Sequence, residues 1–209
     1  GDLVRTVVDM SADPKYLLAD GSAALKADYP KLFAVIGDSV YPPNTAIDTP
    51  AITPPGAASG CASSADGTYI VIATGAPNFV SFYKFDGTNY VKMADPAALP
   101  PGAASGVSCD DAGVYWAVTT GAPNYITLYK RTGEIFTKIA DPTGGIGAAA
   151  AGSKWSGDGN FFTAVYGAPP FMANFERSGD TFSAMALPPA GDQPGGAASG
   201  AAWNTTGTQ

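Results

Sequence analysis

The 209-residue chain contains no histidine and only two cysteines, and these absences exclude several kinds of site. Histidine is the commonest metal ligand and the usual general base beside a serine or cysteine nucleophile. Cys61 and Cys109 are too few for a disulfide scaffold. We interpret them as two small buried thiols, although a bridge between neighbouring repeats stays open. The sequence leads us to expect no metal, no cofactor and no catalytic residues.

Charge is also scarce, which bears on the partners. Charged residues make up 14% of the chain, the net charge is −7, and Lys and Arg form no run. A nucleic-acid surface needs a basic stripe to neutralise phosphates, and an anionic membrane attracts basic segments. No apolar stretch reaches the roughly 18 residues that span a bilayer, and no basic-then-apolar signal segment opens the chain. We therefore expect no nucleic-acid partner and no membrane insertion.

What the chain does contain is a repeat. TGAPNFVSFYK begins at Thr74 and TGAPNYITLYK at Thr120, and the two differ at only three places. Two sets of glycines keep the same spacing of 46 residues: Gly75, Gly121 and Gly167 each begin a GAP, and Gly60, Gly106 and Gly152 each end a GAASG or AAAAG. A fourth GAASG ends at Gly200, two residues late. A period of this size is typical of a propeller or solenoid unit.

The content of each unit favours a propeller. In the first unit a small-residue segment precedes Gly67, and the apolar, β-branched run TYIVIAT follows it. The runs FVSFYK and TNYVKM come next, separated by Gly-containing turns, and no amphipathic helix fits. Four antiparallel strands in about 46 residues describe a β-propeller blade. We predict an all-β fold of about 3.4 blades, at residues 53–98, 99–144, 145–190 and, in part, 191–209.

Each strand position carries suitable side chains. The small first strand suits a crowded central axis, and the apolar second strand suits a position between two blades. We expect Lys84, Lys92, Lys130 and Lys138 to point outward from the outer strands. We interpret Asp66 and Asp158 as turn residues rather than calcium ligands, and Asp95 and Asp141 as parts of the links between blades.

The fourth unit stops where its second strand should start. Propellers usually close with four to eight blades, and an open arc would leave the apolar flank of its end blade uncovered. We therefore expect the chain to be a portion of a longer protein, or several chains to complete the ring.

The first fifty residues do not repeat. The pattern predicts strands at Leu3–Met10 and Lys15–Asp20 and a helix between Asp28 and Gly37, a β-β-α microdomain spanning residues 1–38. Residues 39–52, rich in proline, read as an extended linker before the propeller at 53–209.

This segment resembles the phage tail collar domain, which typically reads as a strand, a Pro-Gly-Trp-Leu-Leu-Cys-Asp-Gly-Ser core and a Tyr-x-x-Leu-Phe-x-x-Ile-Gly helix. The matching residues are Tyr16, Leu17, Leu18, Asp20, Gly21, Ser22, Tyr29, Leu32, Phe33, Ile36 and Gly37. Tyr16 stands where Trp is usual, Ala19 where Cys is usual and Lys15 where Gly is usual, and the family's later F-x-L-P-D-x-R segment is missing. The resemblance covers about forty residues.

The resemblance implies a non-enzymatic virion protein of the tail, fibre or collar type. Its microdomain would bind other virion proteins, the protein would be a homo-oligomer, and it would be assembled in the host cytoplasm. The propeller would be displayed for host attachment, to a surface glycan or protein, or for decoration of the particle. The alternatives are a glycan-active propeller enzyme and a bacterial surface adhesin.

The GAP turns provide the candidate binding residues. In a four-stranded blade the link into the blade and the turn after the second strand emerge at the same end, and we name the surface made by residues 75–79, 121–125 and 167–171 the GAP-end face. Its candidate residues for sugar binding are Asn78, Phe79, Asn124, Tyr125, Pro170 and Phe171. Aromatic rings stack on sugar faces and amides bond hydroxyls. The alternative is that Phe79, Tyr125 and Phe171 begin the third strand and pack between blades.

Overall fold

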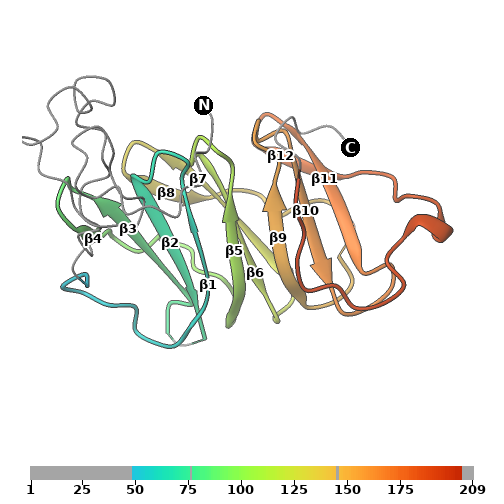
Figure 1. The fold of residues 1–209 in the computed structure, drawn as a ribbon, viewed down its shortest axis with the longest axis horizontal. Coiled ribbons are helices and arrows are strands. Elements are labelled where there is room, and N and C mark those ends of the chain that lie inside the picture. The colour runs from blue at the N-terminus through green and yellow to red at the C-terminus, as the bar shows by residue number, and fades with distance from the viewer. Residues whose placement is uncertain (1–48, 76, 145, 204–209) are drawn as a thin grey trace, which may run out of the picture. The chain divides into compact units, whose positions relative to one another are not determined.

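The computed structural model describes residues 49–75, 77–144 and 146–203, which belong to the compact unit Ile47–Gln209. This part forms three four-stranded antiparallel sheets, which we name blades 1, 2 and 3 (Figure 1). Blade 1 consists of β1 (Ala58–Ser63), β2 (Tyr69–Thr74), β3 (Val80–Phe85) and β4 (Tyr90–Lys92). Blade 2 consists of β5 (Ala104–Cys109), β6 (Tyr115–Thr120), β7 (Ile126–Thr132) and β8 (Ile135–Lys138). Blade 3 consists of β9 (Ala150–Trp155), β10 (Phe161–Tyr166), β11 (Met172–Ser178) and β12 (Thr181–Ala184), and a 3-10 turn η1 (Ala190–Asp192) follows it.

Within each blade the strands pair in chain order, so each sheet is a simple meander. Ala58 lies opposite Thr74 and Ser63 opposite Ile70 in blade 1, and blades 2 and 3 repeat this register. The Gly75 N–H donates to the Ala57 carbonyl, so the link into the blade and the GAP turn lie at one end of the sheet. The expected four strands per unit and the expected all-β propeller architecture are confirmed.

The first strands β1, β5 and β9 lie side by side, and their small residues explain how closely they approach (Figure 1). A Cβ on Gly60 would lie 3.1 Å from the Gly106 Cα, and a Cβ on Gly152 would lie 3.0 Å from the Ser199 carbonyl oxygen. Serine hydroxyls join neighbouring blades here, since Ser59 donates to the Ala104 carbonyl. Ser199 therefore lies close beside β9, although residues 193–203 form no strand.

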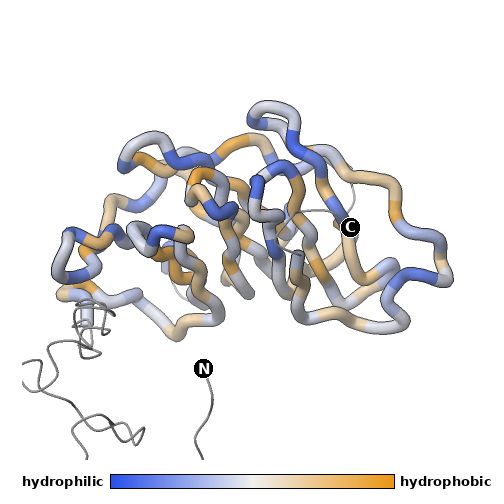
Figure 2. The backbone as a smooth tube through the Cα atoms, turned by 45° about the horizontal axis from the view of Figure 1, so that its top comes forward, coloured by the Kyte–Doolittle hydropathy of each residue, from blue (hydrophilic) through white to orange (hydrophobic). Residues whose placement is uncertain are grey.

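The second strand of the middle blade, β6, is buried on both faces, because it lies between blades 1 and 3. All six residues of β6 are buried. Trp116 and Val118 belong to the core cluster shared with blade 1, and Tyr115 and Ala117 belong to the cluster shared with blade 3. Figure 2 shows hydrophobic residues along the strands and hydrophilic residues at many of the turns. The core therefore lies between the sheets, not within any one of them.

At the outer rim the blades are joined by a repeated pair of contacts. The Arg131 guanidinium lies 4.1 Å from the centre of the Tyr69 ring, and Arg177 lies 4.7 Å from that of Tyr115. Beside these stacks Lys84 pairs with Glu134, and Lys130 pairs with Asp180 at 2.8 Å. The lysines expected to point outward thus form ion pairs with the following blade or within their own.

The turn between the first and second strands is held by side-chain oxygens. Ser64 Oγ accepts the Tyr69 N–H and donates to Asp66, which also accepts the Thr68 N–H at 3.0 Å. The hydrogen bonds from Ser64 and Thr68 lower the pKa of Asp66 to about 2. Blade 3 repeats the arrangement with Ser156 and Asp158. The assignment of Asp66 and Asp158 to turns agrees with these contacts.

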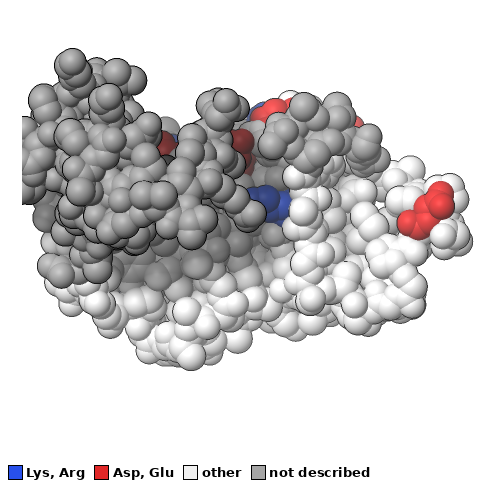
Figure 3. Space-filling view, in the orientation of Figure 1, with Lys and Arg blue, Asp and Glu red and all other residues white. Residues whose placement is uncertain are grey.

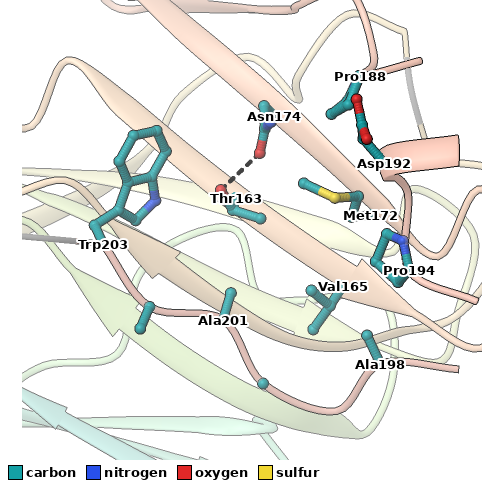
Figure 4. A pocket seen from close by; sticks show the side chains of 12 residues that line it. Thr163, Val165, Met172, Asn174, Pro188, Asp192, Pro194, Ala198, Ala201 and Trp203 are labelled. Atoms are coloured by element: carbon teal, nitrogen blue, oxygen red, sulfur yellow. Dashed lines mark hydrogen bonds between the residues drawn. The ribbon is translucent and has the colours of Figure 1, made fainter. Parts of the chain in front are cut away.

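Blade 3 differs on the flank that faces away from blade 2. Thr163 and Asn174 stand where blade 2 has Ala117 and Leu128, and the Thr163 hydroxyl donates to the Asn174 Oδ1 at 2.7 Å. Residues 188–203 lie against this flank around a cavity of 390 Å³, which Met172 and Trp203 also line (Figure 4). This buried hydrogen-bonded pair makes part of the flank polar.

The predicted microdomain at residues 1–38 lies outside the described residues, as does most of the linker at 39–52, so both stay predictions. Within the described ranges, no helix has the length and apolar character needed to cross a bilayer.

The turn glycines provide a matched test of the contact between blades. Gly113 and Gly133 both have φ = +61°, but a Cβ on Gly113 would lie 2.6 Å from the Ser64 Cβ of blade 1, whereas a Cβ on Gly133 would meet nothing within 4 Å. Gly133→Ala should cost about 1 kcal/mol from backbone strain alone, and Gly113→Ala about 1–3 kcal/mol more. Urea unfolding of both variants measures the difference, and equal losses would show that the blades do not press together here.

Asp110 provides a pH test. Its carboxylate accepts the Val114 and Tyr115 N–H groups, and burial raises its pKa above the ordinary 3.8. The ionised carboxylate therefore costs stability above the raised pKa, and the cost disappears as the pH falls below 3.8. Asp110→Asn keeps an oxygen acceptor, so it should unfold at a higher temperature than the wild type at pH 7. The two proteins should unfold at the same temperature at about pH 3 if this account is right.

Candidate functional site

The GAP-end face is built from turns with unusual backbone conformations. Asn78, Phe79, Asn124, Tyr125 and Phe171 all have positive φ, between 41° and 76°. The carbonyls of Phe79 and Tyr125 close their hairpins by accepting the N–H groups of Thr74 and Thr120. Non-glycine residues in this region carry strain, which persists only where surrounding contacts impose it. The five residues are therefore held in place by their neighbours.

For the two asparagines the neighbour is an aspartate from the link to the next blade. The Asn78 amide donates to Asp95 at 2.8 Å, and the Asn124 amide donates to Asp141 at 3.0 Å. The other oxygen of each carboxylate accepts from a lysine at the end of the fourth strand, Lys92 to Asp95 at 2.5 Å and Lys138 to Asp141 at 2.6 Å. Each Asn–Asp–Lys triad therefore ties the GAP turn, the link and the outermost strand together.

Blade 3 lacks all three members of the triad together. The positions of Asn124, Lys138 and Asp141 are taken by Pro170, Ala184 and Leu187. Any one of the three residues would have no partner without the other two. Their joint replacement in blade 3 therefore agrees with the triad acting as a single structural unit. The candidate residues Pro170 and Phe171 consequently lie in a turn without the polar network of the first two blades.

The aromatic candidates lie directly before the third strands and are half-buried. Phe79 packs against the core between blades 1 and 2, and Tyr125 packs against the core between blades 2 and 3. These contacts agree with the alternative that the rings pack between blades.

One of these rings nevertheless borders open space. A cavity of 440 Å³ is lined by Asn124, Tyr125, Asp141, Pro142, Gly144 and Ile146. The link of blade 2 reads DPTGGIG where that of blade 1 reads DPAALPP, so neither Pro100 nor Pro101 of blade 1 has a proline counterpart in blade 2. The structure thus brings Asn124 and Tyr125 together on a hollow and adds the Asp141 carboxylate to them.

The charges of the described part are mostly occupied by structural contacts. Figure 3 shows a face on which the described surface is largely uncharged. No group of three or more Cys, Asp or Glu side chains that could hold a metal occurs among residues 49–75, 77–144 and 146–203. A hydrogen-bonded amide, a carboxylate neutralised by a lysine and a tyrosine ring provide binding chemistry, not an acid–base pair.

The fold defines the class of this protein: it is an all-β chain with the radial, four-stranded blades of a β-propeller. No protein-family model and no curated protein matches the chain. Among solved structures it is similar to hydrazine synthase from Kuenenia stuttgartiensis, with a TM-score of 0.50 and 14% identity over 68% of this chain and 38% of that one. It is also similar to a putative 6-phosphogluconolactonase from Bacteroides uniformis, with a TM-score of 0.49 and 16% identity over 60% of this chain and 39% of that one. The likeness shows the fold alone.

Sequence reasoning missed the partners of the asparagines. Asp95 and Asp141 were assigned to the links, and Lys92 and Lys138 to the outward surface, without a contact between them. The signal that could have found the triad is its joint loss in the third repeat.

Asn124 donates a hydrogen bond to Asp141 and also adopts a positive φ, and two substitutions separate the energetic effects of these two features. Asn124→Gly removes the hydrogen bond to Asp141 but tolerates φ = +76°, whereas Asn124→Ala removes the bond and adds strain. We expect a loss of about 1 kcal/mol for Gly and about 2 kcal/mol for Ala in urea unfolding. In an Asp141→Ala background the two losses should shrink by the same amount, because the shared hydrogen bond is already gone. Unchanged losses in that background would contradict the triad.

Proposed function

We propose that this chain is part of a non-enzymatic structural protein of a bacteriophage particle, in which the propeller is a rigid platform for attachment to a surface glycan of the host. Its N-terminal segment would join it to other virion proteins, and the GAP-end face would meet the host. The single observation that carries the virion assignment is the tail-collar-like sequence of residues 1–38.

The geometry of the GAP-end face supports the attachment role. The Asn–Asp–Lys triads hold the turns of blades 1 and 2 in one conformation, and a preorganised surface loses little entropy on binding. The 440 Å³ cavity places Tyr125 beside the Asn124 amide and the Asp141 carboxylate. A sugar ring can stack on the tyrosine while its hydroxyls donate to the carboxylate, and such a site needs no catalytic group.

The disposition of the carboxylates supports a binding role over a glycan-active enzyme. Glycoside hydrolysis uses two carboxyl groups about 5–9.5 Å apart with different pKa values. On the GAP-end face, Asp95 and Asp141 are each held by a lysine and an amide. Both oxygens of each carboxylate therefore already have structural partners.

The virion assignment is tested by locating the protein. Antibodies raised against the 209-residue chain should label virus particles purified from the source culture in immunogold electron microscopy. The bacterial envelope of uninfected cells serves as the control. Label confined to the envelope would favour the adhesin and overturn the proposal.

The attachment site is tested by replacing the ring at the cavity. Tyr125→Leu keeps an apolar group against the core but removes the flat face, and it should lower binding to a glycan array or to host cells about tenfold, the equivalent of about 1.4 kcal/mol. Phe79→Leu, the same change at the same turn of blade 1, is the matched control for folding. If Tyr125→Leu binds as well as the wild type, the cavity is not the attachment site.

A further inference from the structure

A third cavity lies at the other end of the blades, on the axial side of the first strands. Its volume is 550 Å³, and we name it the axial cavity. The ends of β1, β5 and β9 and the turns after β1 and β5 provide its polar lining, which includes Cys61, Ser63, Ser108, Cys109, Asp111, Ser153 and Lys154. Three blades thus contribute to one hollow that does not involve the GAP-end face.

The repeat is broken at this cavity. The three first strands share glycine at Gly60, Gly106 and Gly152, but the five residues that follow read CASSA, VSCDD and SKWSG. Alanine in blade 1 thus becomes Lys154 in blade 3, and another alanine becomes Asp111 in blade 2. A propeller axis favours small residues, so charged side chains need a reason other than packing. Residues that break the repeat without a packing reason are candidates for a functional role.

Some of these departures do have structural reasons and can be set aside. Asp110 replaces the Ser64–Asp66 pair, because it accepts the Val114 and Tyr115 N–H groups by itself. Ser108 and Ser153 hydrogen-bond each other at 2.7 Å, which joins blades 2 and 3. Both cysteines are free thiols, and Cys109 donates to the Ser63 carbonyl. The expectation that both are buried is wrong for Cys61, which is exposed. Burial raises the pKa of the Cys109 thiol to about 12, so this thiol is not a nucleophile at neutral pH.

Asp111 and Lys154 are not explained in this way. The other described lysines, at positions 84, 92, 130 and 138, all form ion pairs. Across residues 49–75, 77–144 and 146–203, the side chain of Lys154 forms neither an ion pair nor a hydrogen bond, and the same holds for the carboxylate of Asp111. Both are exposed and line the same cavity without pairing with each other. Two opposite charges that do not pair with each other therefore line one hollow, together with several hydroxyls.

We propose that the axial cavity binds a small zwitterion, with its ammonium group beside Asp111 and its carboxylate beside Lys154. A ligand with both charges places an opposite charge beside each side chain. A singly charged ligand is attracted by one of the two side chains and repelled by the other. The hydroxyl group of Ser63 can provide a hydrogen bond to the middle of the zwitterion. This site is separate from the attachment site, and its failure would leave the proposed function standing.

The test is calorimetric titration of the full 209-residue chain with two zwitterions of different charge separation, serine and γ-aminobutyrate. Butyrate and butylamine serve as singly charged counterparts. At least one zwitterion should bind, and each singly charged compound should bind at least about tenfold more weakly, because it loses one charge-assisted interaction. Binding of neither zwitterion would overturn the proposal, as would butyrate or butylamine binding as tightly as the better zwitterion.

Two variants assign the charges. Asp111→Asn should weaken the zwitterion about tenfold without weakening butyrate, and Lys154→Gln should weaken the zwitterion about tenfold without weakening butylamine, because each change removes the like charge that the singly charged compound meets. Glu176→Gln is the matched control for the loss of a carboxylate, and Lys84→Gln for the loss of an ammonium group; neither residue lines the cavity. Zwitterion affinity that survives both Asp111→Asn and Lys154→Gln would overturn the assignment.

Discussion

The structure depends on the burial of each blade's flat apolar faces against its neighbours. β6 shows this most clearly, since Trp116 packs toward blade 1 and Tyr115, one residue earlier, packs toward blade 3. A strand that is apolar on both sides has no stable place in an isolated sheet, because each buried large side chain contributes about 1.5–3 kcal/mol. The radial arrangement, the small inner residues and the outer ion pairs all follow from covering these two faces.

Because the blades repeat, each departure from the repeat can be compared with two versions of the same position. At the outer rim the Tyr–Arg and Lys–acid contacts occur twice, at both interfaces of the described part. The flank of blade 3 that faces away from blade 2 departs from this repeat. The residues of the rim contacts are replaced there by Phe161 and Glu176, and two apolar core residues are replaced by Thr163 and Asn174. The flank is therefore specialised, and residues 188–203 lie against it with Trp203 stacked on Phe161.

The two ends of the propeller use polar residues differently. At the GAP-end face, asparagine, aspartate and lysine satisfy one another and hold a shape, which leaves Tyr125 and its cavity as the place where a ligand could gain contacts. At the axial cavity, Asp111 and Lys154 have no such partners in the described ranges. At the GAP-end face a ligand would meet polar groups that hold one another in place, whereas at the axial cavity it would meet two charged groups that have no partner in the described ranges, and this difference separates the two sites.

The sequence by itself determined the period, the four strands of each blade, the turn glycines and the sandwiched second strand, because strand propensity and turn geometry are local and repeat with the residues. It also placed Asn78 and Asn124 correctly in their turns. Only the tertiary structure decided what those amides touch, since Asn78 and Asp95 are brought together by the return of the fourth strand. It likewise decided that Asp111 and Lys154, from different blades, face one cavity: contacts between blades depend on the rotation from one sheet to the next, which no local pattern encodes.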